Sequence, residues 1–261
     1  MKIKISLAQT QIQLADPRFN LEKAVHLISK SASENSQLIL FPELWSSGFD
    51  LANAARYCQH NKVILENLAV LAGDLNIAIG GSLLLEENGQ IYNTFTMISS
   101  AGKIVARYNK IHLFHPMQEN LYCQPGNHLQ TVDFPWGCAG LAVCYDLRFP
   151  ELFRSYAIKG ATLFFIPAQW PLKRIEHWKL LLRARAVENL SFVVATNCAG
   201  KIGDDYFGGS SAVISPWGET LVEGSELDEE LLHAEIDLDG VARARRSINA
   251  LNERRPDIYQ L

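Results

Sequence analysis

A cysteine lies at the junction between a predicted strand and a predicted helix. Cys144 ends an apolar strand expected over residues 140–144, and a turn leads to a helix expected over 151–159. Side chains at the ends of buried strands emerge into a crevice. The backbone N–H groups from Tyr145 onward would lie near a helix N-terminus, where they stabilise an anion and lower the pKa of a thiol. Cys144 is therefore a candidate nucleophile, although a buried core cysteine accounts for the segment as well.

A glutamate and a lysine occupy similar positions elsewhere in the chain. Glu43 follows the apolar run 37–41 and is surrounded by aromatic residues, and desolvation there would raise its pKa and make it a base near neutrality. Lys110 lies where a predicted strand becomes a loop and could stabilise an oxyanion. Each also has an ordinary interpretation, Glu43 as a helix N-terminal carboxylate and Lys110 as a surface lysine.

Composition limits the kind of protein that carries these residues. The chain has 261 residues, of which 48% are hydrophobic, and it has no linker-like stretch, so we expect one domain over residues 1–261. A net charge of −4 argues against nucleic acid and anionic membrane as partners. No apolar run approaches the roughly 20 residues of a membrane helix, and residues 1–8 alternate like a strand rather than a signal peptide. Five scattered cysteines without a C-x-x-C pair favour a reducing cytoplasm and neither disulfides nor zinc.

Hydrophobic periodicity predicts an α/β protein. Strands are expected over residues 3–9, 37–41, 77–86, 91–99, 103–108, 140–144, 161–166, 192–197, 211–215, 219–223 and 231–236, and helices over 18–35, 62–75, 151–159, 177–189 and 241–249. Continuous apolar strands between helices require sheets covered by helices, and alternating hairpin strands require a sheet face that packs on something. Two sheets packed face to face with helices outside satisfy both requirements.

Two segments of the chain resemble each other. Residues 38–45 and 163–170 are both apolar strands followed by Pro-x-x-Trp, and each follows a strand and a helix. Eight similar residues also arise by chance, so an internal repeat and coincidence both remain open here.

Taken together, the three candidate residues resemble the nitrilase superfamily of carbon–nitrogen hydrolases, whose members use a glutamate, a lysine and a cysteine in that order. Residues 38–45, 108–114 and 140–151 resemble its three catalytic motifs. The stretches 183–189 and 209–218 and the Arg-Arg-Pro-Asp-Ile-Tyr ending add to the resemblance, which covers essentially the whole chain.

The resemblance implies a fold and a set of roles. The fold would be a four-layer α/β/β/α sandwich with a core over about residues 1–245 and a tail, 246–261, that could lie at the interface of a homodimer. Glu43 would be the general base, Cys144 the nucleophile and Lys110 the oxyanion partner, assisted by the Tyr145 N–H. Glu119 matches a second glutamate that orders the site and contacts Lys110. Neither a metal nor an organic cofactor is implied.

The resemblance also implies a substrate class. The segment Pro167-Ala-Gln-Trp-Pro171 followed by His177-Trp178 is most similar to the ω-amidases, which hydrolyse the terminal amide of 2-oxo acids such as 2-oxoglutaramate and 2-oxosuccinamate. Such a substrate needs a cation in the pocket. The candidates for substrate contacts are Phe114, Arg148, Trp170 and Arg174, with Lys173 as a further cation.

Several alternatives stay open. Arg148 could instead hold the turn after Cys144 through an ion pair, and the substrate could be deaminated glutathione or another small aliphatic amide. A Cys–His hydrolase using His112 or His177 is possible in principle, and His112 with His115 could form half of a metal site. A non-catalytic binding module on the same fold is a more distant alternative.

Overall fold

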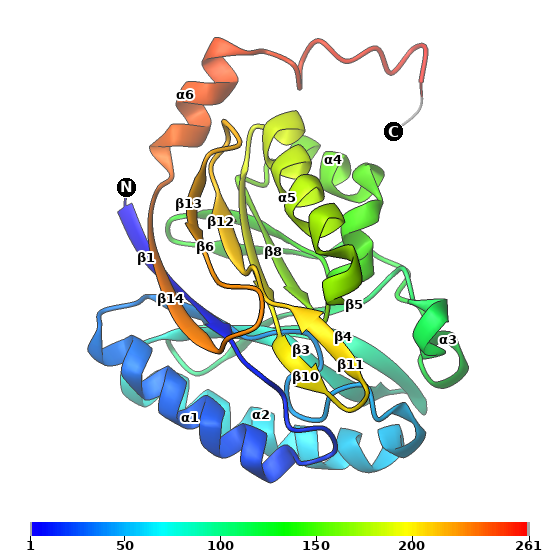
Figure 1. Cartoon of the computed structure of the whole chain (residues 1–261). Coiled ribbons are helices and arrows are strands. Elements are labelled where there is room, and N and C mark those ends of the chain that lie inside the picture. Colours follow the sequence, from blue (N-terminus) through cyan, green and yellow to red (C-terminus); the bar gives the residue numbers. More distant parts are fainter. Residues whose placement is uncertain (1, 260–261) are drawn as a thin grey trace.

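Two six-stranded sheets form the middle of the molecule, and helices cover their outer faces (Figure 1). The computed structural model describes residues 2–259. The first sheet has the order β14-β1-β2-β3-β4-β5 and the second β13-β12-β9-β8-β7-β6. The strands of the first sheet are β14 (Glu230–Asp237), β1 (Lys2–Gln9), β2 (Leu38–Leu40), β3 (Ala78–Glu87), β4 (Gln90–Ile98) and β5 (Ile104–Asn109). Those of the second are β13 (Thr220–Glu223), β12 (Ala212–Ile214), β9 (Phe192–Asn197), β8 (Leu163–Ala168), β7 (Gly137–Leu141) and β6 (Thr131–Phe134).

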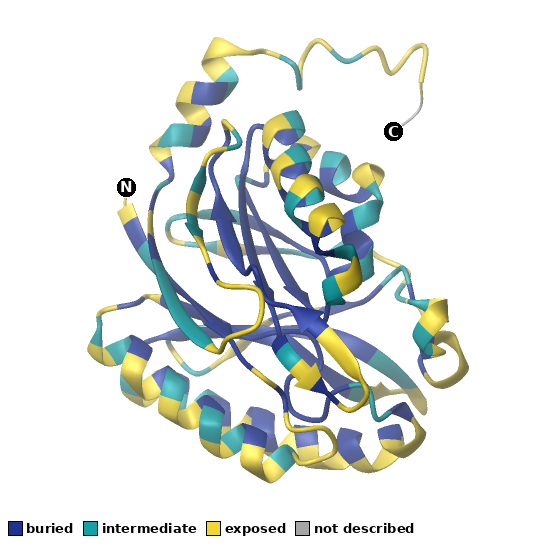
Figure 2. Ribbon diagram, viewed as in Figure 1, coloured by how far each residue is buried: buried dark blue, intermediate teal, exposed yellow. Residues whose placement is uncertain are grey.

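The alternation of side chains along the strands explains the four layers. On β2, Leu38 and Leu40 point into the core that the two sheets share, whereas Ile39 packs with the helices outside. Helices α1 (Pro17–Ser33) and α2 (Ala54–Leu75) cover the first sheet, and α4 (Pro150–Ile158) and α5 (Ile175–Asn189) cover the second (Figure 1). The buried residues form a continuous interior between these layers (Figure 2). The predicted α/β/β/α sandwich is confirmed.

The two halves of the chain repeat one topology. In each half three parallel strands (β1-β2-β3 and β7-β8-β9) are joined through two helices, and two antiparallel strands follow (β4-β5 and β12-β13). Each sheet is completed by an antiparallel strand on the other edge, β14 beside β1 and β6 beside β7. The similar segments 38–45 and 163–170 occupy equivalent places, on β2 and β8. The internal repeat is therefore present in the fold.

Some element boundaries differ from those predicted. Helix α2 begins at Ala54, eight residues before the predicted start. Ala54, Tyr57 and Cys58, spaced i, i+3 and i+4, extend its buried face and pack in a small apolar cluster. The strand predicted over 140–144 is instead β7, Gly137–Leu141, and Cys144 begins a 3₁₀ helix, Cys144–Arg148. The sequence did not predict β6, the hairpin β10 (Ala199–Ile202) and β11 (Asp205–Gly208), the helix α3 (Glu119–Tyr122) and three further 3₁₀ turns (Leu51–Asn53, His115–Met117 and Leu172–Arg174).

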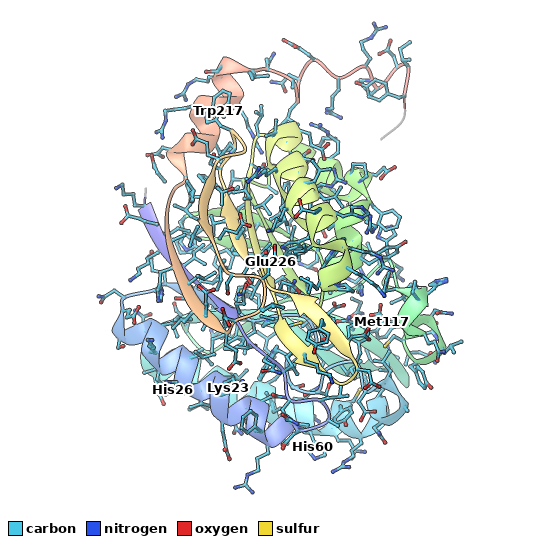
Figure 3. The ribbon with its side chains drawn as sticks, in the orientation of Figure 1. Lys23, His26, His60, Met117, Trp217 and Glu226 are labelled. Carbon is cyan, nitrogen blue, oxygen red and sulfur yellow. The ribbon has the colours of Figure 1, made fainter. Side chains whose placement is uncertain are left out.

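The remaining segments lie at the periphery. Trp217 marks the predicted turn between β12 and β13, and Lys23, His26 and His60 lie on the outer helices (Figure 3). After α6 (Asp239–Ser247) a mostly exposed tail passes over the end of α4, and Leu251 packs against the core (Figures 1 and 2). Residues 260 and 261 of the predicted tail lie outside the described part. Within residues 2–259, no helix is both long and apolar enough to cross a membrane.

Candidate active site

Cys144 lies in a sharp turn that follows strand β7 of the second sheet. β7 ends at Leu141, and Cys144 opens the 3₁₀ helix with a φ of +46°, in the left-handed region that residues with a Cβ adopt at a cost. Only 6% of the residue is exposed. Its Sγ lies 3.8 Å from the carbonyl oxygen of Gln169, which follows β8. The turn thus holds the thiol at the carboxyl ends of two neighbouring parallel strands, as expected for a crevice residue.

Lys110 lies between two buried carboxylates. Its Nζ donates to Glu43 Oε1 at 2.7 Å and to Glu119 Oε2 at 2.8 Å, and all three side chains are fully buried. Glu43 follows β2, Lys110 follows β5 and Glu119 opens α3, so the structure brings together three residues from separate segments. The Phe114 N–H also donates to Glu119 Oε2, at 2.7 Å, which fixes that carboxylate in the loop after Lys110.

Two amide side chains complete this cluster. The Asn93 side-chain NH₂ donates to Glu43 Oε1 and to Glu119 Oε1, both at 2.8 Å. Gln169 donates its backbone N–H to Glu43 Oε2 at 3.0 Å and its side-chain NH₂ to the Glu43 carbonyl at 2.8 Å. Neither Asn93 nor Gln169 was predicted from the sequence. A polar residue directly after the apolar run 163–168, in the segment that repeats the Glu43 segment, was the signal for Gln169; nothing comparable marks Asn93.

Burial dominates the electrostatics of the cluster. It raises the pKa of Glu43 above its ordinary value, and the positive charge of Lys110 only partly opposes this. Burial and the charge of Glu43 raise the pKa of the Cys144 thiol well above its usual range, so the lowering expected from a nearby helix N-terminus is wrong. Burial lowers the pKa of Lys110, but the charges of Glu119 and Glu43 outweigh it and leave that pKa well above its usual range. At neutral pH the site therefore holds a neutral thiol and an ammonium cation. Cys144 and Glu43 lie close enough to shift each other's pKa, so the thiol proton has a basic group nearby.

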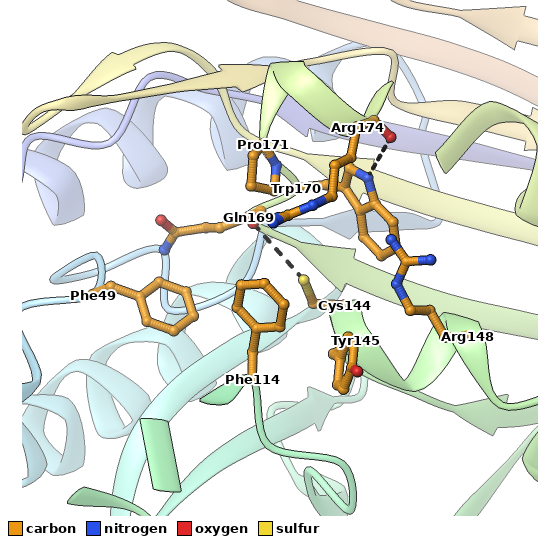
Figure 4. Close-up of a pocket in the computed structure, with 9 residues that line it drawn as sticks. All are labelled: Phe49, Phe114, Cys144, Tyr145, Arg148, Gln169, Trp170, Pro171 and Arg174. Carbon is orange, nitrogen blue, oxygen red and sulfur yellow. Dashed lines mark hydrogen bonds between the residues drawn. The ribbon is translucent and has the colours of Figure 1, made fainter. Parts of the chain in front are cut away.

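The thiol opens into a narrow pocket. Aromatic and apolar side chains form most of its wall, and Arg148 and Arg174 supply the positive charge (Figure 4). The lining residues are Phe49, Phe114, Cys144, Tyr145, Arg148, Gln169, Trp170, Pro171 and Arg174. Of the residues predicted to contact substrate, Phe114, Arg148, Trp170 and Arg174 all line this pocket. Lys173 is exposed and does not line it.

Both arginines rest against aromatic rings. The Arg148 guanidinium lies 4.9 Å from the Trp170 ring centre, and that of Arg174 lies 5.6 Å from the Phe114 ring centre. Arg148 also lies within hydrogen-bond distance, 3.3 Å, of His177 Nδ1. Across residues 2–259 neither arginine forms an ion pair, so the structure does not support the alternative in which an ion pair makes Arg148 structural. A carboxylate entering the pocket would meet two uncompensated cations.

The histidines and the other cysteines have different surroundings. His112 contacts the buried Asp146, and in the described part of the chain no His, Cys, Asp and Glu side chains group as three or more metal ligands. Cys144 has no hydrogen bond to a histidine among residues 2–259. Cys58, Cys123 and Cys198 are buried free thiols and Cys138 is half-buried. Burial raises the pKa of Cys123 to about 12. None of these four lines the pocket.

Comparison with known proteins identifies the family. The Carbon-nitrogen hydrolase family profile matches residues 4–246. The chain is 39% identical to the 2-oxoglutaramate amidase of Bacillus subtilis, over 99% of this chain and 100% of that protein. It is 32% identical to the human omega-amidase NIT2, over 97% and 96% of the two chains.

Solved structures show the same fold. A CN-hydrolase superfamily protein from Xanthomonas campestris, XC1258, superposes with a TM-score of 0.90 at 30% identity, covering 98% of each chain. An amidase variant from Nesterenkonia sp. AN1, at 27% identity and a TM-score of 0.89, covers 99% of this chain and 95% of its own. That structure carries the acetamide moiety of fluoroacetamide covalently added at the active-site cysteine. The protein described here belongs to the carbon–nitrogen hydrolase family and is a hydrolase of carbon–nitrogen bonds.

Proposed function

We propose that this hydrolase cleaves the terminal amide of a small 2-oxo dicarboxylic acid monoamide, such as 2-oxoglutaramate or 2-oxosuccinamate, and releases ammonia and the acid. The observation that carries the proposal is the buried Glu43–Lys110–Glu119 cluster beside Cys144, beneath a pocket that holds two unpaired arginines. The similarity to a 2-oxoglutaramate amidase and to omega-amidases supports the same substrate class.

Acylation begins at the thiol. Glu43 accepts the Cys144 proton as Sγ attacks the amide carbon, and the raised pKa of Glu43 makes it a stronger base than an exposed carboxylate. Lys110 and the Tyr145 N–H stabilise the tetrahedral oxyanion. Glu43 then returns the proton to the amide nitrogen, the carbon–nitrogen bond breaks, ammonia leaves, and the acyl group remains on Cys144 as a thioester.

Deacylation uses the same groups. Glu43 removes a proton from water as its oxygen attacks the thioester carbon, Lys110 and the Tyr145 N–H again face the oxyanion, and the carbon–sulfur bond breaks. The proton held by Glu43 returns to the departing sulfur, which restores the neutral thiol. Glu119 holds Lys110 in place by accepting from its ammonium group, and Asn93 connects Glu43 to Glu119 by donating to both carboxylates.

The pocket supports the substrate class through its charge and its aromatic walls. Arg148 and Arg174 are the groups that would bind the carboxylate distant from the amide, since guanidinium forks match carboxylate geometry. The Trp170 ring packs against the Arg148 guanidinium, and the Phe114 ring packs against that of Arg174. Both rings would also form walls beside the short carbon chain of the substrate. An amidase for deaminated glutathione or another small aliphatic amide is the second candidate. The Glu43–Lys110–Glu119 cluster beside Cys144 supports it equally, but a neutral aliphatic amide would leave the two arginines without a carboxylate to bind.

Product release decides between these substrates: ammonia is measured for the primary amides, and the released cysteinylglycine for deaminated glutathione, whose scissile amide is secondary. We expect kcat/KM to be highest for 2-oxoglutaramate or 2-oxosuccinamate, and at least about tenfold lower for deaminated glutathione and for neutral aliphatic amides. If the 2-oxo monoamides are among the poorest substrates, the substrate assignment fails while the amidase chemistry stands. Hydrolysis of none of these amides by a folded protein would favour the binding module.

The assembly and location of the protein remain predictions. We expect a homodimer with residues 246–261 at or near the interface, a cytoplasmic location, and activity without a metal or organic cofactor. Light scattering of the full chain and of a chain ending at residue 245 tests the first expectation: the full chain should have twice the monomer mass. Activity that persists after exhaustive chelation tests the last.

A further inference from the structure

A fully buried carboxylate lies two residues after Cys144 and accepts four hydrogen bonds. Asp146 Oδ1 accepts from the His112 backbone N–H at 3.0 Å and lies 2.7 Å from His112 Nδ1. Asp146 Oδ2 accepts from the Tyr108 hydroxyl at 2.8 Å and from the Val143 N–H at 2.9 Å. Each carboxylate oxygen of Asp146 thus has two hydrogen-bond partners, which uses its full capacity as an acceptor.

These donors come from the two segments that carry Lys110 and Cys144. Tyr108 and His112 lie two residues before and two residues after Lys110, and Val143 directly precedes Cys144. Tyr108 belongs to β5 in the first sheet, whereas the Cys144 turn follows β7 in the second. One carboxylate thus connects the loop of the oxyanion partner to the turn of the nucleophile across the gap between the sheets.

The contacts require a carboxylate rather than an amide. An asparagine at this position has a single oxygen, and its NH₂ group would face the backbone N–H of either Val143 or His112, which then lacks an acceptor. Buried donors without an acceptor are costly, so the two segments would move apart. The His112 ring, stacked on Phe149 at 3.5 Å between ring centres, covers the outer side of this carboxylate and keeps water away from it.

We propose that Asp146 is a positioning residue for amide hydrolysis: it sets the separation between Lys110 and Cys144, and so places the oxyanion donor against the carbon that the thiol attacks. The inference rests on the roles proposed above for Lys110 and Cys144. It adds that the site depends on a group that touches neither substrate nor the reacting atoms.

The test compares two reactions of the same cysteine in Asp146→Asn and Tyr108→Phe. Amide turnover needs the oxyanion donor, whereas alkylation of Cys144 by iodoacetamide forms no oxyanion. We expect kcat to fall by about 10²-fold in Asp146→Asn and by about tenfold in Tyr108→Phe, by analogy with the loss of one oxyanion donor. The alkylation rate should stay within about threefold of wild type in both variants.

Tyr156→Phe is the matched control. Tyr156 is a buried tyrosine whose hydroxyl donates to the Leu141 carbonyl at 2.7 Å and accepts from the Gln130 N–H at 3.2 Å, and it does not connect to the Lys110 loop. It should lose thermal stability much as Tyr108→Phe does but keep kcat within about threefold. The proposal is overturned if Asp146→Asn keeps its turnover, if turnover and alkylation fall together, or if Tyr156→Phe loses as much turnover as Tyr108→Phe. If Asp146→Asn does not fold, the two tyrosine variants decide.

The assay uses whichever linear amide the wild-type protein hydrolyses fastest. An error in the substrate assignment therefore leaves this test intact. Absence of turnover with every amide in wild type would instead count against the proposed function.

Discussion

The Lys110 ammonium lies 2.7 Å from a carboxylate oxygen of Glu43, and neither side chain has any exposed surface. Such a pair is stable only when hydrogen bonds satisfy the remaining polar atoms, and here Glu119, Asn93 and Gln169 supply them. The arrangement keeps Lys110 charged and leaves Glu43 as the acceptor for the Cys144 proton. The catalytic predictions below follow from this relationship.

Replacement of the thiol should abolish the chemistry without unfolding the protein. We expect Cys144→Ala to lower kcat/KM for any amide substrate by at least about 10³-fold, because no other nucleophile lines the pocket within the described chain. Cys138→Ala is the control, since Cys138 is only half-buried and lies on β7 away from the pocket. Ammonia release measures both; a Cys144→Ala variant with more than a few per cent of wild-type activity would contradict the assignment.

Removal of the base should block acylation itself. Glu43→Gln keeps the size of the side chain but cannot take the thiol proton, so the rate of acylation should fall by about 10² to 10⁴-fold. Single-turnover ammonia release measures this step. Glu66→Gln, an exposed carboxylate on α2, should have no effect. If a histidine were the base, Glu43→Gln would leave acylation largely intact.

The raised pKa of Glu43 should be visible in pH profiles. Activity needs ionised Glu43, so the acid limb of kcat/KM should have its midpoint above pH 4.5, the ordinary pKa of a glutamate. The thiol pKa lies well above 9, so thiol ionisation should cause no change in activity below about pH 9. An acid limb centred at or below pH 4.5 would contradict the burial argument.

The same shift predicts a pH dependence of stability. A carboxyl whose pKa is raised by folding contributes stability that is fully present below its unfolded pKa and is lost as pH rises through the folded pKa. Glu43→Gln removes that titration. Its melting temperature relative to wild type should therefore increase as pH rises through the Glu43 pKa, and a difference that is constant with pH would argue against the shift.

The two arginines should control selectivity rather than chemistry. Arg148→Gln and Arg174→Gln each remove a charge-assisted contact, which predicts a loss of about 10- to 100-fold in kcat/KM for 2-oxoglutaramate. Butyramide has no carboxylate, and its kcat/KM should change less than about threefold. Lys173→Gln, which alters an exposed neighbour outside the pocket, is the control. Equal losses on both substrates would mean that the arginines shape the pocket without binding a carboxylate.

The layers, and the candidate residues that the structure brings together, could be identified from the sequence because both depend on local patterns. Apolar runs such as 38–41 and 163–166 identify buried strands, and a Cys, Glu or Lys at the end of such a run is visible in one dimension. The internal repeat in the sequence reflects the shared topology of β1–β5 and β7–β13.

The supporting residues could not be predicted because their roles depend on contacts across the fold. Asn93 reaches Glu43 and Glu119 only because of where β4 places it, and Asp146 reaches Tyr108 from the other sheet. The positive φ of Cys144 was also hidden, since a non-glycine residue gives no local sign of it. The hairpin of β10 and β11 and the helix α3 are too short for periodicity to reveal.

Formation of a thioester on Cys144 is tested most directly by measuring how the acyl group partitions between water and hydroxylamine. Glutaramate is the suitable substrate, because it has the terminal amide and carboxylate but no keto group for hydroxylamine to capture. We predict that the hydroxamate replaces the acid in proportion to hydroxylamine concentration, that ammonia release is not slowed, and that Cys144→Ala forms neither product. Ammonia release at the wild-type rate with only the acid formed at every hydroxylamine concentration would contradict an acyl-enzyme on Cys144.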